Sequence, residues 1–471
     1  MGSEEQLKEE AQVSLSLPAE REEKTENPSL PPAKKDKKAK SNPKSKKKKV
    51  LTGIIAVALA AVGFVVGLGV QPLFMDAEMR SLMQIKNAIQ DDYLYEVSDE
   101  MFYSTLFDAI NDDLLDPYSK YMTKEEYAEN LTAAEGQRSG IGVVYTTTEE
   151  GKKVYVDFVR GNSPAEDAGL QRGDRLVAVG SSQTQLTEVQ SYQHFKELVL
   201  AQGYGVPFYL QYERGSALST VSVANRTFAE NYVYYRTGET SFAFTGAEAT
   251  TMQEKNNPIV GLPEDVAYIR LTQFNGNAAQ QFSSAMNLFK EEGKKRLVLD
   301  LRGNGGGYMD VLSSISSYFC KSATSFAPTV ATAVYADGDK EYFHANGNVY
   351  SRYFAEDSEI YLLADDGTAS ASECLIGCMV DYGALNLQNV CLFEKDGVAK
   401  TYGKGIMQTT YTFGAGDTDA IRLTTARIQW PISGRCIHGV GVTTADGCKS
   451  ALYSFTQDGE VYAGLTALGI L

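Results

Sequence analysis

The stretch EIYLLADDGTASASECLIGCMVDYG, residues 359–383, joins a short apolar strand to a helical pattern. Glu359 to Ala364 is typical of a buried strand, and the apolar groups that follow predict a helix that starts near Ala371. The same order recurs through residues 229–471, where the runs VAYIRLTQF and RLVLDLRG each precede a helical pattern. Alternating strands and helices favour α/β units with a partly parallel sheet. The sequence therefore predicts a mixed α/β (α+β) core domain over residues 229–471.

Three hydroxyl side chains lie around the junction of this strand and this helix: Thr368, Ser370 and Ser372. The N–H groups at the start of a helix favour negative charge, so a nucleophile and its oxyanion hole are often built there. Ser370 and Glu373 also form the S-x-x-E pattern of a capping box, which satisfies helix-start donors without catalysis. The local pattern favours the cap, so a nucleophile needs support from a group that takes its proton.

A candidate for that group is Lys404, which stands between two glycines in TYGKGIMQ, residues 401–408. Flanking glycines let the backbone bring an ammonium group into a tight, desolvated site, where its pKa falls and the neutral amine can act as a general base. Gln408 lies four residues on, so within one strand it would share a face with Lys404 and could orient the amine. The alternative, a solvated surface lysine, stays open at this point.

Histidine offers no better base. None of the three histidines, His194, His344 and His438, stands in a defensible Ser-His-Asp order. A conventional Ser-His hydrolase that uses His438 is kept as a rival hypothesis. No CxxC motif and no Cys/His pair has the spacing of metal ligands, so we predict no zinc site.

The six cysteines permit disulfides in an oxidising compartment. Cys374 and Cys378 would be one turn apart on the predicted helix, which is a poor arrangement for bonding each other. Free, buried thiols are the simpler interpretation for most of the six.

The first 75 residues differ from the rest in charge. The net charge of the chain is −16, yet residues 1–49 hold 13 basic and 9 acidic residues with few large apolar groups, so we predict a disordered, lysine-rich tail. No charged residue occurs from Val50 to Met75, and this run is long enough to cross a bilayer as a helix. The lysines before it favour a cytoplasmic N-terminus and place residues 76–471 outside the cell. The chain is thus predicted to be a single-pass membrane protein.

Two other interpretations of this region are weaker. The lysine run could be a nuclear address or a nucleic-acid arm, but it has no arginine or aromatic residue and adjoins the apolar run, so no nucleic-acid partner is predicted. A signal peptide cut near ALAAVG would normally have a shorter apolar run and a shorter basic region. An uncleaved anchor at residues 50–75 is therefore favoured.

Two further regions separate the anchor from the core. Residues 76–136 place apolar groups at three- and four-residue intervals and predict a helical segment without chemistry of its own. Residues 137–228 hold short β-rich runs and predict a small separate domain. Two stretches in it, GIGVV at 140–144 and SPAEDAGLQRGDRLVAV at 163–179, resemble a PDZ domain.

The PDZ resemblance implies a site for peptide C-termini. In such a site, loop N–H groups bind the terminal carboxylate while the peptide adds a strand to the edge of the sheet. The implied peptide-binding residues are Gly140, Ile141, Gly142 and Val143.

Beyond these parts, the order of motifs resembles the carboxyl-terminal processing proteases, also called tail-specific proteases. Outside the PDZ-like stretches, the motifs are DPYSKYMTKEEY at 116–127, YIRLTQF at 268–274, LVLDLRGNGGG at 297–307, TASASE at 368–373, YGKGIMQ at 402–408 and IRLTTARIQWPISGRCIHGVG at 421–441. A chance match of all of them in this order is negligible.

The resemblance implies a serine endopeptidase that works through an acyl-enzyme. Ser370 matches the family's nucleophile, Lys404 its base and Gln408 the glutamine that supports the base. The implied oxyanion donors are the backbone N–H groups of Ala371 and Gly306. The family further implies protein substrates with apolar C-termini, no cofactor, and the option of a homodimer.

The chain departs from the family pattern at Gly305, where the family usually has proline, so a looser oxyanion loop is expected. Asp381 matches an aspartate of some members, but an exposed helix-end carboxylate explains it equally well. A rival from another functional class is a catalytically silent PDZ adaptor that holds peptide tails at the membrane.

Overall fold

A computed structural model describes residues 76–148, 152–413, 419–453 and 458–471. The chain divides into two compact units, and their described parts are residues 76–113 and Leu114–Leu471. The predicted tail, residues 1–49, and the predicted anchor, residues 50–75, lie outside the described residues.

The smaller unit is helical. It contains α3 (Ala77–Asp92) and α4 (Asp99–Ala109), which a π-helical turn, Ile110–Leu114, follows. Asp76 and Ser98 start the two helices by accepting backbone N–H bonds at 2.7 and 3.1 Å, as N-cap side chains do. In the part of the chain that the structure describes, no helix combines the length and apolar character needed to cross a bilayer.

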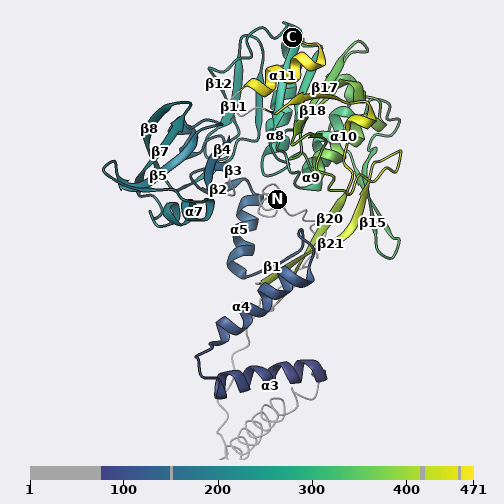
Figure 1. Ribbon diagram of the computed structural model, residues 1–471. Helices are drawn as coiled ribbons and strands as arrows, with labels where there is room; N and C mark the ends of the chain where they lie inside the picture. The colour runs from purple at the N-terminus through teal and green to yellow at the C-terminus, as the bar shows by residue number, and fades with distance from the viewer. Residues whose placement is uncertain (1–75, 149–151, 414–418, 454–457) are drawn as a thin grey trace, which may run out of the picture. The chain divides into compact units, whose positions relative to one another are not determined.

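The larger unit contains the predicted α/β core (Figure 1). Its main sheet has nine strands, in the order β12-β11-β10-β13-β14-β17-β18-β19, with β22 also paired to β18. The strands are β10 (Val233–Arg236), β11 (Ser241–Thr245), β12 (Thr251–Lys255), β13 (Val266–Leu271), β14 (Arg296–Asp300), β17 (Glu359–Ala364), β18 (Val390–Lys395), β19 (Val398–Ala399) and β22 (Lys449–Leu452). β13, β14, β17 and β18 pair in parallel, which confirms the predicted partly parallel sheet.

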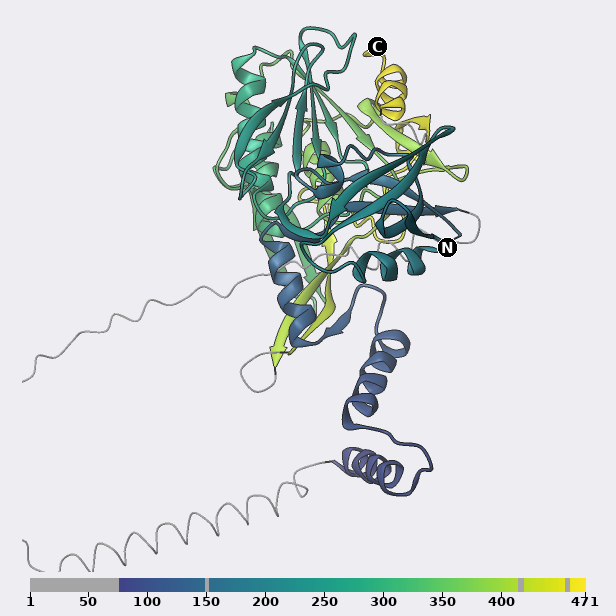
Figure 2. The same ribbon diagram turned by 90° about the vertical axis from the view of Figure 1, so that its left-hand side faces the viewer.

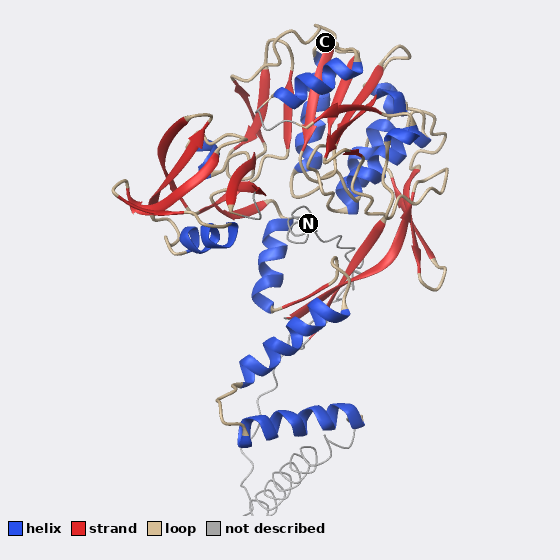
Figure 3. Ribbon diagram, viewed as in Figure 1, coloured by secondary structure: helices blue, strands red, loops and turns tan. Residues whose placement is uncertain are grey.

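Helices, blue in Figure 3, connect the parallel strands. Their apolar faces are buried in the core. They are α8 (Ala278–Glu291), α9 (Met309–Ser316) and α10 (Ala371–Asp381), and the chain ends with α11 (Gly459–Leu468). Phe282 and Phe289 of α8 are fully buried, because they recur at the helical interval on one face. The helix α10 starts at Ala371, as predicted.

A second sheet is antiparallel. It contains β1 (Lys120–Met122), β15 (Thr329–Tyr335), β16 (Lys340–His344), β20 (Ile406–Phe413) and β21 (Asp419–Gln429), in the order β1-β21-β15-β16 with β20 beside β21. Figure 2 shows the long β20–β21 pair in yellow-green, with the blue helix α5 (Lys124–Ala134) beside β21. This sheet places residues near 120 beside residues near 420, because β1 pairs with β21.

Residues 137–228 form the predicted β-rich domain. A six-stranded sheet runs in the order β3-β4-β5-β7-β8, with β6 paired to β5, and β2 pairs with β9 separately. The elements are β2 (Gln137–Gly140), β3 (Val143–Thr148), β4 (Lys153–Val159), α6 (Pro164–Asp167), β5 (Arg175–Ser182), β6 (Gln185–Glu188), α7 (Tyr192–Leu200), β7 (Pro207–Arg214), β8 (Ala217–Ala224) and β9 (Arg226–Ala229). β3 lies at one edge of this sheet, so its outer backbone groups are open to pairing with another strand.

Candidate active site

Ser370 lies in the turn that joins β17 to α10. Its backbone has φ 55° and ψ −117°, a conformation that side-chain-bearing residues rarely adopt. Strain of this kind persists where the surroundings enforce it, and a sharp strand-to-helix turn is one way to expose a serine nucleophile. The turn also follows the carboxyl end of a parallel strand, where α/β folds place their ligands.

The structure separates the three candidate hydroxyls. Thr368 is fully buried, and its Oγ1 donates to the Leu301 carbonyl at 2.9 Å. Ser372 is also fully buried, and its Oγ donates to the Asn304 carbonyl at 2.9 Å. Ser370 is only half-buried, and no hydrogen bond donated by its Oγ is recorded among the described residues. Of the three, Ser370 is therefore the candidate whose hydroxyl is not committed to a backbone carbonyl among the described residues.

Gly306 lies directly against Ser370. A Cβ at Gly306 would lie 2.8 Å from Ser370 Cβ and from the Ala371 nitrogen, and 2.9 Å from the Ala369 oxygen. Glycine is required because nothing larger fits between these backbones, and because φ is +102°. The Gly306 N–H donates to Asn304 Oδ1 at 3.0 Å, so as an oxyanion donor it would first have to leave this bond. The Ala371 N–H starts α10 beside Ser370, and no backbone bond from it is recorded in the described part of the chain.

We expect Gly306→Ala to reduce cleavage by at least about 10²-fold, because a displacement of about 1 Å in the reacting groups can cost that much. Gly303→Ala is the matched control. Gly303 also has a positive φ, of 67°, but a Cβ there would meet nothing within 4 Å. Rates of peptide cleavage for the two variants, compared at equal folded fraction, check this expectation; equal losses would show that backbone strain rather than the close approach matters.

Glu373 connects the Ser370 turn to the Lys404 loop. Its Oε2 accepts the N–H of Ser370 at 3.0 Å and that of Lys404 at 2.9 Å. Its Oε1 accepts the hydroxyl of Thr401 at 2.5 Å and the N–H of Gly403 at 2.8 Å. Complete burial raises the pKa of Glu373 to about 7, and these four donors oppose the rise. Glu373, the predicted capping residue, thus also holds the backbones of Ser370 and Lys404 close to each other.

We expect Glu373→Gln to lower both the thermal midpoint and the cleavage rate, because an amide NH₂ would face N–H donors. Leaving such buried donors unmatched costs about 1–3 kcal/mol for each group. Differential scanning calorimetry and a cleavage assay check the two effects together. The exposed Glu356, changed to glutamine, serves as the control; an unchanged midpoint in Glu373→Gln would contradict the bridging role.

Lys404 is a buried lysine with the electrostatics of a base. It is 5% exposed and lies in the loop before β20, and the Tyr118 ring centroid is 4.8 Å from its Nζ. Burial, with the positive charge of Arg422, lowers the pKa of Lys404 to about 7, while Asp116 and Glu373 oppose the shift. A large fraction of the amine is therefore neutral near pH 7 and able to take a proton. The surface-charge alternative for Lys404 is wrong.

Gln408 lies on β20, beside the same cluster. It is 5% exposed, its Nε2 donates to Thr424 Oγ1 at 3.1 Å, and that hydroxyl donates to Asp116 Oδ1 at 3.2 Å. The argument that placed Gln408 and Lys404 on one face of a strand is wrong, because β20 begins only at Ile406 and a register shift precedes Gln408. Side-chain bonds to β21, rather than strand periodicity, hold Gln408 in place.

Ser370 and Lys404 are in one neighbourhood without a recorded bond between them. Glu373 binds the backbone N–H of both residues, yet no hydrogen bond joins Ser370 Oγ to Lys404 Nζ among the described residues. In proteins without bound substrate, catalytic bonds are often long and tighten only in the complex. Glu373 therefore holds the backbones of both residues, while their side chains are not hydrogen-bonded to each other among the described residues.

The remaining candidates have structural explanations. Asp381 Oδ2 accepts the N–H groups of Ile432 and Ser433 at 2.8 and 2.9 Å, so it fixes a turn beyond the end of α10. The side chain of His438 is exposed, although its backbone lies beside Gly405. All six cysteines are free thiols, as the simpler interpretation predicted.

A groove lies between β3 and α7 in the β-rich domain. The predicted residues Gly140, Ile141, Gly142 and Val143 line it together with apolar side chains of α7, among them Phe195 and Val199. Gly142 has φ +79°, and a Cβ there would lie 2.1 Å from Ser163 Cβ, so the loop needs glycine. Because β3 is an edge strand, the groove offers both an apolar wall and open backbone groups.

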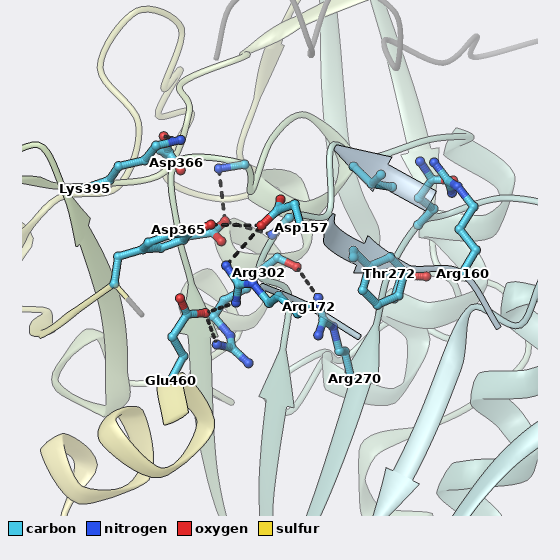
Figure 4. Close-up of a pocket in the computed structure, with 16 residues that line it drawn as sticks. Asp157, Arg160, Arg172, Arg270, Thr272, Arg302, Asp365, Asp366, Lys395 and Glu460 are labelled. Carbon is cyan, nitrogen blue, oxygen red and sulfur yellow. Dashed lines mark hydrogen bonds and ion pairs between the residues drawn. The ribbon is translucent and has the colours of Figure 1, made fainter. Parts of the chain in front are cut away.

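Charged side chains join this domain to the core on the wall of a pocket (Figure 4). Glu460 Oε2, on α11, forms ion pairs with the guanidinium groups of Arg172 at 2.5 Å and Arg302 at 2.6 Å. Arg302 directly precedes the loop that contains Gly306. In the same pocket, Asp365 accepts the Gly303 N–H at 2.8 Å and so connects that loop to the Ser370 turn. The pocket is therefore continuous with the backbone that positions the site.

Comparison with known proteins agrees with this geometry. Residues 265–445 match peptidase family S41, a range that includes Gly306, Ser370, Lys404 and Gln408. The core domain is thus similar to peptidase family S41 over residues 265–445. Residues 139–224 match the PDZ domain, which identifies the β-rich domain and its groove. The chain thus combines a region similar to peptidase family S41 with a PDZ domain.

Several relatives of this chain are named as proteases. It is 28% identical over 320 residues to a carboxyl-terminal-processing protease of a Picosynechococcus strain, and 26% identical over 367 residues to a protein of Staphylococcus saprophyticus named probable CtpA-like serine protease. These matches cover 67% and 78% of this chain but 66% and 64% of the relatives, so the chain spans just under two thirds of their length. The solved structure of the photosystem II D1 C-terminal processing protease is 22% identical, covering 77% of this chain and 84% of that one, with a TM-score of 0.43. A TM-score of this size carries no argument about function.

Sequence reasoning missed part of the site. Residues 76–136 were expected to carry no chemistry, yet Asp116 and Tyr118 lie beside Lys404. Tyr118 also donates its hydroxyl to Tyr402 at 2.8 Å, which ties this segment to the Lys404 loop. The motif DPYSKYMTKEEY was the available signal, but its spacing alone does not show which residues it meets.

Proposed function

We propose that the protein is a membrane-anchored serine endopeptidase that recognises substrate C-terminal tails through its PDZ domain and cleaves by a Ser-Lys mechanism. This proposal rests on two residues: a strained serine at a helix start, whose hydroxyl donates no recorded hydrogen bond among the described residues, and a buried lysine whose pKa falls to about 7. A neutral amine beside a serine can activate the serine hydroxyl as a nucleophile without histidine.

The proposed reaction has two steps. Neutral Lys404 takes the proton of Ser370 Oγ, which attacks the scissile carbonyl and forms a tetrahedral oxyanion. The Ala371 N–H, at the positive end of α10, stabilises that charge, with Gly306 N–H joining once it leaves Asn304. Lys404 then protonates the leaving amine, and water hydrolyses the acyl-Ser370 ester by the reverse proton path. Gln408 and Asp116, which both bond to the Thr424 hydroxyl, hold the surroundings of the Lys404 amine in place.

The PDZ groove is proposed to recruit the substrate. A tail would pair with β3 while its terminal carboxylate meets the Gly140–Gly142 loop and its apolar side chain meets α7. A peptide with an apolar C-terminus should bind, and the same peptide with an amidated C-terminus should bind at least about tenfold more weakly, because a bond to a charged group contributes about 1.5–3 kcal/mol.

The silent-adaptor hypothesis makes a different prediction. An adaptor binds the tail peptide and leaves its carrier intact, whereas the proposed peptidase cleaves an unfolded protein that bears that tail. The full chain, assayed with and without added tail peptide, decides between them: binding without cleavage in both conditions would exclude the peptidase.

The location is proposed from the sequence alone. Residues 1–49 would be cytoplasmic, residues 50–75 would form the anchor, and the peptidase would lie outside the cell. Protease treatment of intact cells should degrade the PDZ and core domains while sparing the lysine-rich tail. If neither the two domains nor the tail were degraded, the peptidase would lie inside the cell. A homodimer stays a prediction from the family resemblance.

A further inference from the structure

Two of the six cysteines face each other behind the active site. Cys378 lies in the middle of α10, and Cys320 ends the helical turn η3 (Ser317–Phe319) that extends α9. Their sulfur atoms are 3.7 Å apart, although 57 residues separate them in sequence. Cys378 is fully buried and Cys320 is 8% exposed. Neither thiol takes part in the proposed peptidase chemistry.

The surroundings hold the two sulfurs in contact. Val330, Ala345 and Tyr382 pack with both cysteines in one apolar cluster. Cys320 Sγ also donates to the Ser316 carbonyl at 3.4 Å, and the Tyr382 carbonyl accepts the Ser322 N–H at 3.2 Å. No third metal-binding side chain joins the pair in the described ranges, so a metal site does not explain it.

We propose that Cys320 and Cys378 are a site of disulfide formation. The oxidant is a disulfide-containing compound or protein. The thiolate of Cys320, the more exposed of the two, attacks one sulfur of the oxidant and releases its other half as a thiol. Cys378 Sγ then attacks Cys320 Sγ and displaces the second half. One S–S bond forms in the protein and one breaks in the oxidant, and the two thiol protons leave on the released thiols.

The bond would brace the frame of the active site. α9 begins two residues after Gly307, at the end of the Gly306 loop, and α10 begins directly after Ser370. A link between the extension of α9 and the middle of α10 therefore fixes the two helices that follow the oxyanion loop and the nucleophile. To form the bond, the two sulfur atoms must approach from 3.7 Å to about 2.05 Å. The hydrogen bond with Cys320 and, after it, burial raise the pKa of Cys378, which makes the second step slow.

The test is chemical and does not depend on the proposed peptidase activity. The full chain is refolded in glutathione disulfide, and a second sample is treated with it in the folded state. Both are quenched in acid, unfolded, alkylated with N-ethylmaleimide and mapped by mass spectrometry. We expect a peptide pair linked through Cys320 and Cys378 in both samples. N-ethylmaleimide on both residues in the refolded sample, or a link from either to a different cysteine, would overturn the proposal.

Thermal stability gives a second readout. Closing a long loop should raise the thermal midpoint of the oxidised chain by roughly 5 °C or more over the reduced chain. Cys378→Ser should lose this difference. Cys374→Ser, one turn away on the same helix, should retain it and serves as the matched control. A difference that survives in Cys378→Ser and disappears in Cys374→Ser would overturn the assignment of the pair.

Discussion

Replacing Ser370 with alanine is expected to reduce cleavage of an unfolded protein by about 10⁴-fold or more, because the acyl-enzyme route is lost with its nucleophile. Neither neighbour can substitute. Thr368 and Ser372 are fully buried, and their hydroxyls are committed to the carbonyls of Leu301 and Asn304. The fold should survive the change, since Ser370 is half-buried and donates no recorded hydrogen bond through its side chain.

Ser372→Ala is the matched control for Ser370→Ala. It removes a buried donor from the Asn304 carbonyl, so it should lower the thermal midpoint while cleavage stays measurable. Calorimetry and initial cleavage rates, measured on the same preparations, separate the two roles. The reverse pattern, in which Ser372→Ala is inactive and Ser370→Ala is active, would show that Ser370 is not the nucleophile.

Replacing Lys404 with methionine is expected to reduce cleavage by about 10²- to 10⁴-fold, the usual contribution of a general base. The wild-type rate should depend on pH with a definite sign. Lys404 acts as a base only when neutral, and its pKa lies near 7, so the rate should be low in acid and rise as pH increases through about 7. Methionine also removes a buried amine that is costly to charge, so the variant should be at least as stable as the wild type.

Two further variants make the test of Lys404 specific. Lys404→Arg keeps a positive charge but cannot release a proton near neutral pH, so it should be as inactive as Lys404→Met. His438→Ala should retain cleavage, because its exposed side chain has no role in the proposed mechanism. Loss of activity in His438→Ala together with activity in Lys404→Met would favour the rival Ser-His hydrolase.

The sequence predicted the features that depend on neighbouring residues. The start of α10 at Ala371 follows from a local pattern, in which Glu373 accepts the Ser370 N–H within one turn. The partly parallel sheet follows from alternating apolar strands and helices, which each show their own periodicity. The glycine-containing loop at residues 140–143 was predicted from its motif, whereas the side chains of α7 across the groove and the contact of Gly142 with Ser163 depend on distant segments.

Features made by distant segments were not predictable in the same way. β1 pairs with β21 through Tyr121 and Ile421, and no local pattern indicates a partner three hundred residues away. For that reason, the antiparallel sheet and the place of Tyr118 beside Lys404 became visible only in the folded chain. Glu373 is the clearest case, because its capping role is local and its bonds to the Lys404 loop are not.

The most direct test of the Ser-Lys account is to trap the acyl-enzyme. The full chain is mixed with a peptide ester whose acyl group carries a mass label, and the reaction is quenched in acid within the first turnover. Peptide mapping should find the label as an ester on Ser370, with its amount rising with pH through about 7 and absent from Lys404→Met. Turnover of the ester with no label on Ser370, or with the label on another residue, would contradict the account.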